Sequence, residues 1–152
     1  MKIISKNKAA YHNYEIQKNY EVWIVLKWFE VKSVKNSQVN IKDAIVRIDD
    51  RELRIVGMDI PLYSKTSPLL AKWYEPKGRR KLLITKKELT KISAMTDKPG
   101  NIIIPLEVFV SKTGFIKLQI GIAKLMRKVE KKQILKERDV KKQMDREIKN
   151  LK

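Results

Sequence analysis

The strongest constraint on the fold is a two-residue alternation of apolar and polar side chains over residues 14–26. The even positions of this segment are apolar except for Lys18, while the odd positions are mostly polar and include Glu21. Successive side chains of a β-strand point to opposite faces. The pattern therefore predicts either one long strand or two strands that meet at a bend near Lys18 and Asn19, with one face buried and one exposed.

A shorter pair of apolar segments, residues 44–48 and 53–56, predicts a β-hairpin. Both segments are rich in isoleucine, valine and leucine, which favour half-buried strands. Asp49 and Asp50 stand between them, and aspartate favours tight turns. We therefore expect two antiparallel strands joined at these two residues.

A second hairpin is predicted for residues 102–110 and 116–122. Isoleucine and leucine occupy the even positions of the later segment, again with the period of a strand. The polar connection contains Gly114, which is free to adopt the left-handed turn conformation. Pro105 lacks a backbone N–H, so we expect it at a sheet edge or a bulge.

One internal helix has a clear start signal. Thr85 and Glu88 have the spacing of a capping box, and apolar residues follow at helical intervals. The helix should end by Met95 or Thr96, ahead of a Lys-Pro-Gly break. Several short strands, a few short helices and no alternation of strand with helix indicate a mainly β protein, built as a small closed antiparallel β-barrel.

The charge of the chain points to a polyanionic partner. Lys and Arg total 35 against 17 Asp and Glu, a net charge of +18 in 152 residues. A compact body with that charge repels itself, which makes RNA, DNA or an acidic membrane surface the candidate partners. Residues 1–5 are too short and too soon charged for a signal peptide, and no apolar run approaches the roughly 20 residues of a membrane span. We expect a cytoplasmic protein with no membrane partner.

The sequence offers little for catalysis. It has no cysteine and one histidine, His12, which excludes thiol catalysis, cysteine-ligated metals and multi-histidine sites. It has no glycine-rich phosphate loop, nucleophile elbow or zinc-protease motif. Glu21 and Glu30 would face opposite sides of one continuous strand. We therefore expect a protein that is not an enzyme, with no catalytic residue, metal site, cofactor or small-molecule substrate.

RNA binding is better supported by the residues. Trp23 shares the polar side of the first predicted strand with Glu21, so both side chains should be accessible. Residues 72–81 interleave Trp73 and Tyr74 with lysine and arginine, which suits base stacking together with phosphate contacts. The alternative is that Trp73 and Tyr74 cover one end of the barrel while the cations are simply solvated.

The composition changes at the C-terminus. Residues 124–152 hold 12 Lys and Arg against 5 Asp and Glu, with no Gly, Pro or aromatic residue. A thin apolar stripe of Val140, Met144, Ile148 and Leu151 cannot support a core, and an isolated helix of this length is marginal in water. We expect a basic tail that is disordered when free and helical when bound. The alternative is a helix packed on the barrel.

The chain also contains a series of short motifs. In order, they are N-K-A-A-Y-H-N-Y at residues 7–14, Y-E at 20–21, E-V-K-S at 30–33, V-N-I-K-D at 39–43, R-K-L-L-I at 80–84, G-I-A-K at 121–124 and K-E-R-D at 136–139. Together they resemble the motifs of the small protein B family, the SsrA-binding proteins of trans-translation. Trp23, Trp28 and Ser37 stand where that family has glycine.

The resemblance implies an OB-fold-like barrel over residues 1–123 that binds the tRNA-like domain of tmRNA. It also implies a basic tail over residues 124–152 for the ribosomal decoding centre and mRNA channel. The tmRNA contacts that it implies by position, with Trp23 added because it shares the face of Glu21, are Asn7, Lys8, His12, Glu21, Trp23, Arg80, Lys81 and Leu83. The implied ribosome and mRNA-channel contacts are Lys124, Arg127, Lys128, Glu130, Lys131, Lys132, Leu135, Lys136 and Arg138. The implied function is non-enzymatic delivery of tmRNA to stalled ribosomes.

The residues alone also allow less specific roles. His12 suits a surface or capping position, Asn7 and Lys8 suit plain solvation, and Leu83 suits core packing. For the whole chain, the alternative function is a generic basic OB-barrel that binds ribosomal or other RNA with no part in ribosome rescue.

Overall fold

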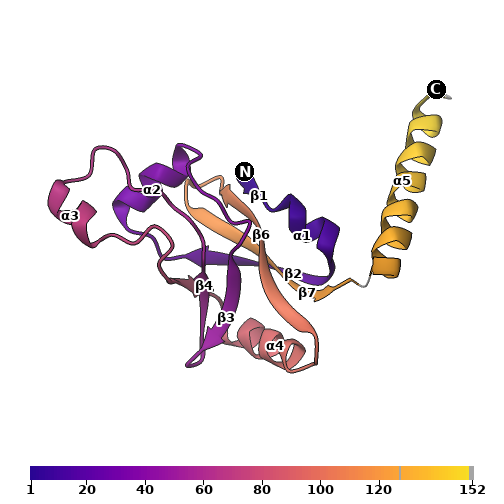
Figure 1. Cartoon of the computed structure of the whole chain (residues 1–152), viewed down its shortest axis with the longest axis horizontal. Helices are drawn as coiled ribbons and strands as arrows, with labels where there is room; N and C mark the ends of the chain where they lie inside the picture. The colour runs from indigo at the N-terminus through magenta and orange to yellow at the C-terminus, as the bar shows by residue number, and fades with distance from the viewer. Residues whose placement is uncertain (127, 151–152) are drawn as a thin grey trace.

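The structure, a computed structural model, describes residues 1–126 and 128–150, and the side chains of residues 1–126 and 135–147. The strands are β1 Lys2–Lys6, β2 Tyr14–Ile24, β3 Ile45–Asp49, β4 Glu52–Val56, β5 Arg80–Leu83, β6 Asn101–Val110 and β7 Ile116–Leu125. The helices are α1 Lys8–Asn13, α2 Trp28–Lys35, α3 Pro68–Trp73, α4 Lys86–Thr96 and α5 Lys128–Asn150. Figure 1 shows the strands gathered in one body, with α5 standing apart from it at the C-terminal end.

The sheet closes on itself to form a barrel. Its strand order is β1-β6-β3-β4-β5-β2-β7, and β7 also pairs with β6, which completes the ring. Every strand pair is antiparallel. The predicted mainly β fold, an antiparallel barrel with short helices, is therefore confirmed.

The alternating segment forms β2, a single strand with a register shift between Ile16 and Lys18. The side chains of Tyr20, Val22 and Ile24 are buried, whereas the odd positions between them are exposed. Of the two predicted alternatives, one long strand is correct, with an irregularity close to the expected bend. Lys18 falls at this irregularity, where the apolar alternation is broken.

Both predicted hairpins are confirmed. In the β3–β4 hairpin, Asp50 and Arg51 form the turn with φ angles of 51° and 62°. Two-residue hairpin turns that match the twist of the strands require a positive φ at both central residues. This turn lies one residue later than predicted, because Asp49 still pairs with Glu52. In the β6–β7 hairpin, Gly114 adopts a φ of 88°.

Pro105 lies where β6 changes partner. One edge of β6 pairs with β3 at Ile103 and with β1 from Glu107 onward. A register shift separates Pro105 from Glu107 in the pairing with β7, so the predicted bulge is confirmed. Gly121 of β7 lies beside this bulge, and a Cβ there would stand 2.9 Å from the side chain of Leu106. The close approach explains why glycine suits this position.

The predicted helix is α4. The hydroxyl of Thr85 accepts a hydrogen bond from the N–H of Glu88 at 3.3 Å, and the helix ends at Thr96. Ile92 is fully buried and belongs to the barrel core, which fixes the helix against the sheet.

Sequence patterns did not predict β1, β5, α1, α2 or α3. Two of these helices do carry start signals. Asn7 accepts a hydrogen bond from the N–H of Ala10 at the start of α1, and Ser67 caps α3 directly before Pro68. These helices are only one or two turns long, so their signals are weak without the tertiary contacts.

The barrel extends beyond the expected boundary at residue 123. Strand β7 continues through Leu125, which pairs with Tyr14 of β2. Met126 is buried, and its N–H donates to the carbonyl of Asn13 at 3.1 Å. The first residues of the expected tail therefore belong to the barrel.

Helix α5 follows, outside the barrel (Figure 1). Val140 and Met144 of the apolar stripe are 49% and 57% exposed, so these two side chains do not pack on the barrel as the alternative required. Arg138 donates to the backbone carbonyl of Tyr11 in α1 at 2.9 Å. The side chain of Ile148 and all of Leu151 lie outside the described part of the chain.

Candidate nucleic-acid interface

The outward side of β2 carries Glu21 and Trp23. The side chain of Glu21 is 51% exposed, and Trp23 is 43% exposed, which confirms that both lie on the accessible face of the strand. An accessible carboxylate can accept hydrogen bonds from base amino and imino groups, and an accessible indole can stack on a base.

Side chains from two neighbouring strands complete this surface. Trp23 pairs in register with Leu83 of β5 and with Lys117 of β7. The ammonium of Lys117 donates to Glu21 at 2.9 Å and lies 4.5 Å from the ring centroid of Trp23. The ring of Phe115 packs against that of Trp23, with centroids 5.0 Å apart. We call Glu21, Trp23, Leu83, Phe115 and Lys117 the β2 face.

Leu83 is exposed, although the residues alone favoured a core position. Strand β5 alternates between buried Arg80 and Leu82 and exposed Lys81 and Leu83. Leu83 is 44% exposed beside Trp23, so it extends the apolar part of the β2 face. Core packing is wrong for Leu83, and its position suits the RNA contact that the family resemblance implies.

Lys81 is accessible at the edge of this face. Its side chain is 47% exposed and its ammonium lies 3.1 Å from a carboxylate oxygen of Glu52. The hydrogen bond from Lys81, and next that from Arg54, hold the pKa of Glu52 below its ordinary value. Exposed ion pairs are weak, so an RNA phosphate can compete for Lys81.

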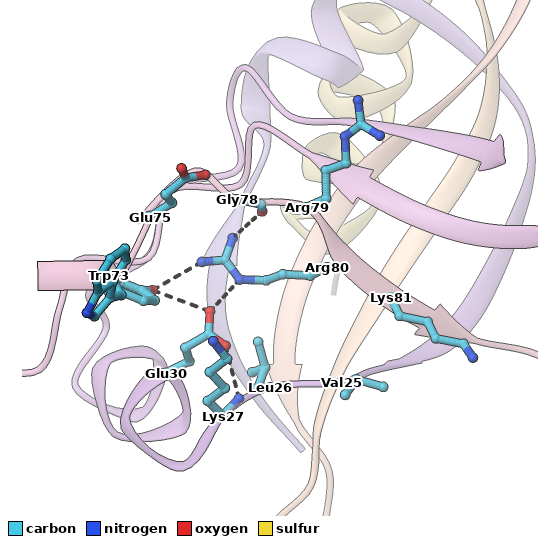
Figure 2. A pocket seen from close by; sticks show the side chains of 11 residues that line it. Val25, Leu26, Lys27, Glu30, Trp73, Glu75, Gly78, Arg79, Arg80 and Lys81 are labelled. Carbon is cyan, nitrogen blue, oxygen red and sulfur yellow. Dashed lines mark hydrogen bonds and ion pairs between the residues drawn. The ribbon is translucent and has the colours of Figure 1, made fainter. Parts of the chain in front are cut away.

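Arg80 lies inside the protein, with 6% of its surface exposed. Its guanidinium donates to the carboxylate of Glu30, the carbonyl of Gly78 and the hydroxyl of Tyr74 (Figure 2). It also donates to the carbonyls of Met58 and Pro76. A guanidinium has five N–H donors, and these bonds use them all. Direct RNA contact through Arg80 therefore does not fit the structure. Its hydrogen bonds instead fix the loop of residues 74–79.

Helix α1 carries the N-terminal residues of the implied site. The amide of Asn7 donates to the carbonyl of Pro105 at 3.0 Å and accepts from the N–H of Ala10, and the residue is 6% exposed. Asn7 therefore caps α1 and ties it to β6, which does not fit the direct RNA contact that the resemblance implies. Lys8 and His12 are exposed and remain available to RNA.

The predicted RNA contacts fall on two surfaces rather than one. Lys8 and His12 precede the start of β2 at Tyr14, whereas Glu21 lies roughly 20 Å further along the strand. The α1 surface and the β2 face would thus contact different parts of one RNA.

Trp73 and Tyr74 have different environments. Trp73 is 80% exposed. The hydroxyl of Tyr74 donates to the carbonyl of Ile60 at 2.7 Å, and its ring packs edge-on against Phe29. Burial, and next the charge of Glu30, raise the pKa of Tyr74. Tyr74 is thus a packing residue, as the alternative expected, while Trp73 is open to solvent.

The predicted tail contacts are only partly described. Lys124 is exposed on β7, and on α5 Lys136 and Arg138 are exposed while Leu135 is half-buried. Arg127 lies outside the described residues. The backbone of α5 includes Lys128, Glu130, Lys131 and Lys132, whose side chains lie outside the described ones. Ribosome contact through the tail stays a prediction.

The described residues show neither a metal-binding cluster nor a membrane-spanning helix. Among them, no group of three or more His, Cys, Asp or Glu is placed to hold a metal ion. Within that same part of the chain, no helix combines the length and the hydropathy needed to cross a membrane.

Sequence reasoning missed Phe115 and Lys117. Phe115 directly follows the turn at Gly114. The signal for it is a large aromatic side chain beside a turn, which the apolar alternation of the following strand does not explain. Lys117 could be placed beside Glu21 only once β7 was known to pair with β2, and that pairing joins segments far apart in the sequence.

Comparisons with known proteins agree with this geometry. The family model described as SmpB protein matches residues 4–150. The chain is 41% identical over 149 residues to the SsrA-binding protein of Persephonella marina, covering 98% of this chain and 95% of that protein. It is 40% identical over 147 residues to the SsrA-binding protein of Coprothermobacter proteolyticus, covering 97% of each. A solved structure described as "tmRNA-SmpB: a journey to the center of the bacterial ribosome" matches with a TM-score of 0.65 and 31% identity, covering 86% of this chain and 93% of that one.

Proposed function

The chain belongs to the SmpB protein family, and from this premise we propose that it binds the tRNA-like domain of tmRNA and delivers it to stalled ribosomes in trans-translation. It acts without a catalytic step or a cofactor, as an RNA-binding adaptor in the cytoplasm. The relatives are named for binding SsrA, and the description of the matched structure names tmRNA-SmpB and the bacterial ribosome.

The observation that carries this proposal is the arrangement of the β2 face. Lys117 contacts both the carboxylate of Glu21 and the ring of Trp23, so these groups are held in a defined relation before RNA arrives. Preorganised groups lose less conformational entropy on binding. A carboxylate that reads base edges and an indole that stacks on a base together favour specific recognition over generic attraction to phosphate.

The net charge of +18 supplies the remaining attraction. Contacts between lysine or arginine and phosphate release counterions, so they strengthen binding to any RNA and weaken as salt rises. In this proposal the basic segment that follows the barrel, residues 127–152, lies in the decoding centre and mRNA channel, where rRNA and mRNA phosphates surround it.

The proposal is tested by the affinity of the full chain for a tRNA-like domain and for a random RNA duplex of equal length, measured by gel shift over a range of salt concentrations. We expect tighter binding to the tRNA-like domain at every salt concentration. Glu21→Gln should weaken that preference with little change in the salt dependence, because the variant removes a base contact and not a phosphate contact.

Glu15→Gln is the matched control, because Glu15 is exposed on the same strand and lies outside the β2 face. It should leave the preference unchanged. Equal affinity of the unmodified chain for both RNAs at moderate salt would contradict the proposal, and would leave a generic basic barrel with no part in ribosome rescue.

A further inference from the structure

A groove lies beside the β2 face, between the start of α2 and the loop that precedes β5. Its volume is about 450 Å³, and its lining includes Val25, Lys27, Trp73, Arg79 and Lys81. The loop of residues 74–79 is far from β2 in the sequence, yet it forms one side of this groove. Figure 2 shows the side chains that line the groove.

Trp73 is the open aromatic surface of this groove. Each of the other two tryptophans packs on a neighbouring ring, Trp23 on Phe115 and Trp28 on Phe29. Among the described residues, Trp73 has neither an aromatic ring nor a cation within stacking distance, and it is 80% exposed. An indole that is left this open is available to stack on a ligand with a flat π-face.

Hydrogen bonds hold the loop that follows Trp73. Arg80 donates to the hydroxyl of Tyr74 at 3.1 Å, to the carbonyl of Pro76 at 2.8 Å and to that of Gly78 at 3.1 Å. These three bonds fix the loop that directly follows Trp73. An aromatic side chain beside a held loop loses less conformational entropy when a ligand stacks on it.

The charged side chains that line the groove are more basic than acidic, which favours an anion: Lys27, Arg79, Arg80 and Lys81 against Glu30 and Glu75. Arg79 and Lys81 extend away from Arg80, whose own charge is neutralised by Glu30 (Figure 2). Arg79 is 3.8 Å from Asp49 in an exposed pair, and Lys27 also lines the groove. Exposed pairs of this kind yield readily to a phosphate.

The groove is continuous with the β2 face. Val25, which lines the groove, follows Trp23 on the chain by two positions and donates its N–H to the carbonyl of Lys81 at 3.0 Å. Lys81 in turn is two positions from Leu83 of the β2 face. An RNA strand that contacts the β2 face could therefore extend into the groove without leaving the surface.

We propose that this groove binds one unpaired nucleotide of an RNA, with the base stacked on the indole of Trp73 and a backbone phosphate held by Arg79, Lys81 or Lys27. Base stacking and phosphate pairing by cations are the two recurring contacts to single-stranded RNA. The choice of RNA as the ligand rests on the proposed function, while the site itself rests on the geometry of residues 73–81.

The test measures the affinity of the full chain for a short unstructured RNA, a uridine oligonucleotide, by fluorescence anisotropy. Loss of one stacked base is worth about 1–3 kcal/mol, so Trp73→Ala should weaken binding roughly 5- to 150-fold. The salt dependence should stay unchanged, because the lost contact carries no charge. Trp73→Phe should recover most of the affinity, since the phenyl ring still stacks.

Leu69→Ala is the matched control, because Leu69 is 72% exposed in the same short helix and does not line the groove. It should bind as the unmodified chain does. An unchanged affinity of Trp73→Ala, in a variant whose melting temperature is also unchanged, would overturn the inference.

The two proposals fail separately. If the unmodified chain prefers the tRNA-like domain but Trp73→Ala binds the oligonucleotide normally, the groove site is wrong and the tmRNA-binding function stands. If Trp73→Ala loses the oligonucleotide while the unmodified chain shows no preference for the tRNA-like domain, the groove site stands and the proposed function is wrong.

Discussion

The guanidinium of Arg80 and the carboxylate of Glu30 form a buried ion pair across fifty positions of sequence, with only 4% and 6% of their side chains exposed. The pair joins α2 to the start of β5. The hydroxyl of Tyr74 lies within hydrogen-bond distance of both Glu30 and Arg80. Helix α2, strand β5 and the loop after α3 therefore meet in one hydrogen-bond network. The network anchors the loop of residues 74–79, which directly follows Trp73 at the end of α3.

Arg80→Met should therefore be strongly destabilising. It leaves the charge of Glu30 buried without its partner, which typically costs about 3–5 kcal/mol. It also removes a hydrogen bond from the loop carbonyls of Met58 and Gly78 and from that of Pro76, which still accepts from the N–H of Ile60. Urea unfolding followed by circular dichroism measures the loss. Arg79→Met is the control, and it should change stability by less than about 1 kcal/mol because its pair with Asp49 is exposed.

The double variant Glu30→Met with Arg80→Met separates the charge from the packing. If the unpaired charge is the main cost, the double variant should be more stable than Arg80→Met alone, because no buried charge is then left without a partner. Equal stability of the two would assign the loss to the carbonyl hydrogen bonds of Arg80 instead.

Helix α2 ends in a left-handed residue that is not glycine. Ser37 has a φ of 62°, its N–H donates to Val34, and the next N–H, of Gln38, donates to Ser33, both at 2.9 Å. This is the Schellman pattern, which favours glycine because a side chain is strained at positive φ. Ser37→Gly should raise the free energy of unfolding by about 0.5–1 kcal/mol, measured by urea unfolding.

A second glycine variant controls for chain flexibility. Lys35→Gly places glycine two residues earlier, inside the helix, where it should lower the free energy of unfolding by about 1 kcal/mol. If both variants lost stability, the left-handed strain at Ser37 would be too small to matter.

Two tyrosines, Tyr11 and Tyr74, should titrate above the ordinary pKa of a tyrosine. Burial, then the charge of Glu30, raise the pKa of Tyr74 above its ordinary value of 10.0. Burial, then the charge of Glu107, raise that of Tyr11. The folded state thus holds these protons more tightly than the unfolded state. The contribution to stability is complete below pH 10 and is lost as the pH rises through the raised values.

Ultraviolet absorbance of tyrosinate during an alkaline titration measures this directly. Tyr74→Phe and Tyr11→Phe should each remove one late-titrating group from the five tyrosines. A titration in which either variant removes a group that ionises near pH 10 would contradict the assignment.

The fold was predictable where the sequence pattern has a period. The alternation in β2, the turn at Gly114 and the cap at Thr85 are local signals, and each predicts its element without knowledge of the rest of the chain. The short helix α2 carries a weaker signal, Glu30 at its third position, whose carboxylate accepts a hydrogen bond from the N–H of Lys27 at 2.9 Å. Its first residue Trp28 follows Lys27, which is an unusual cap, and its position is fixed by contacts with distant residues such as Pro61.

The candidate site was predictable in part. Glu21 and Trp23 followed from the alternation, because one face of β2 must be buried. Arg80 shows the limit: a cation in a basic segment suggests a surface residue, and only the distant carboxylate of Glu30 explains its burial. Whether such a residue is buried depends on its pairing with distant residues, and a single sequence does not show which residues pair.

Removal of residues 127–152 should separate RNA binding from ribosome rescue. The shortened chain keeps Met126 buried and β7 complete, so the barrel should melt at an unchanged temperature and bind the tRNA-like domain with similar affinity. Tagging of a stalled peptide in a reconstituted translation reaction should be abolished, because the basic segment that we propose for the mRNA channel is gone. A chain cut after residue 123 is the contrasting variant. It loses the pairing of Leu125 with Tyr14 and the buried Met126, so it should melt at a lower temperature. If the chain ending at residue 126 lost its affinity for the tRNA-like domain, the barrel would not be the tmRNA-binding unit and the proposed division of roles would be wrong.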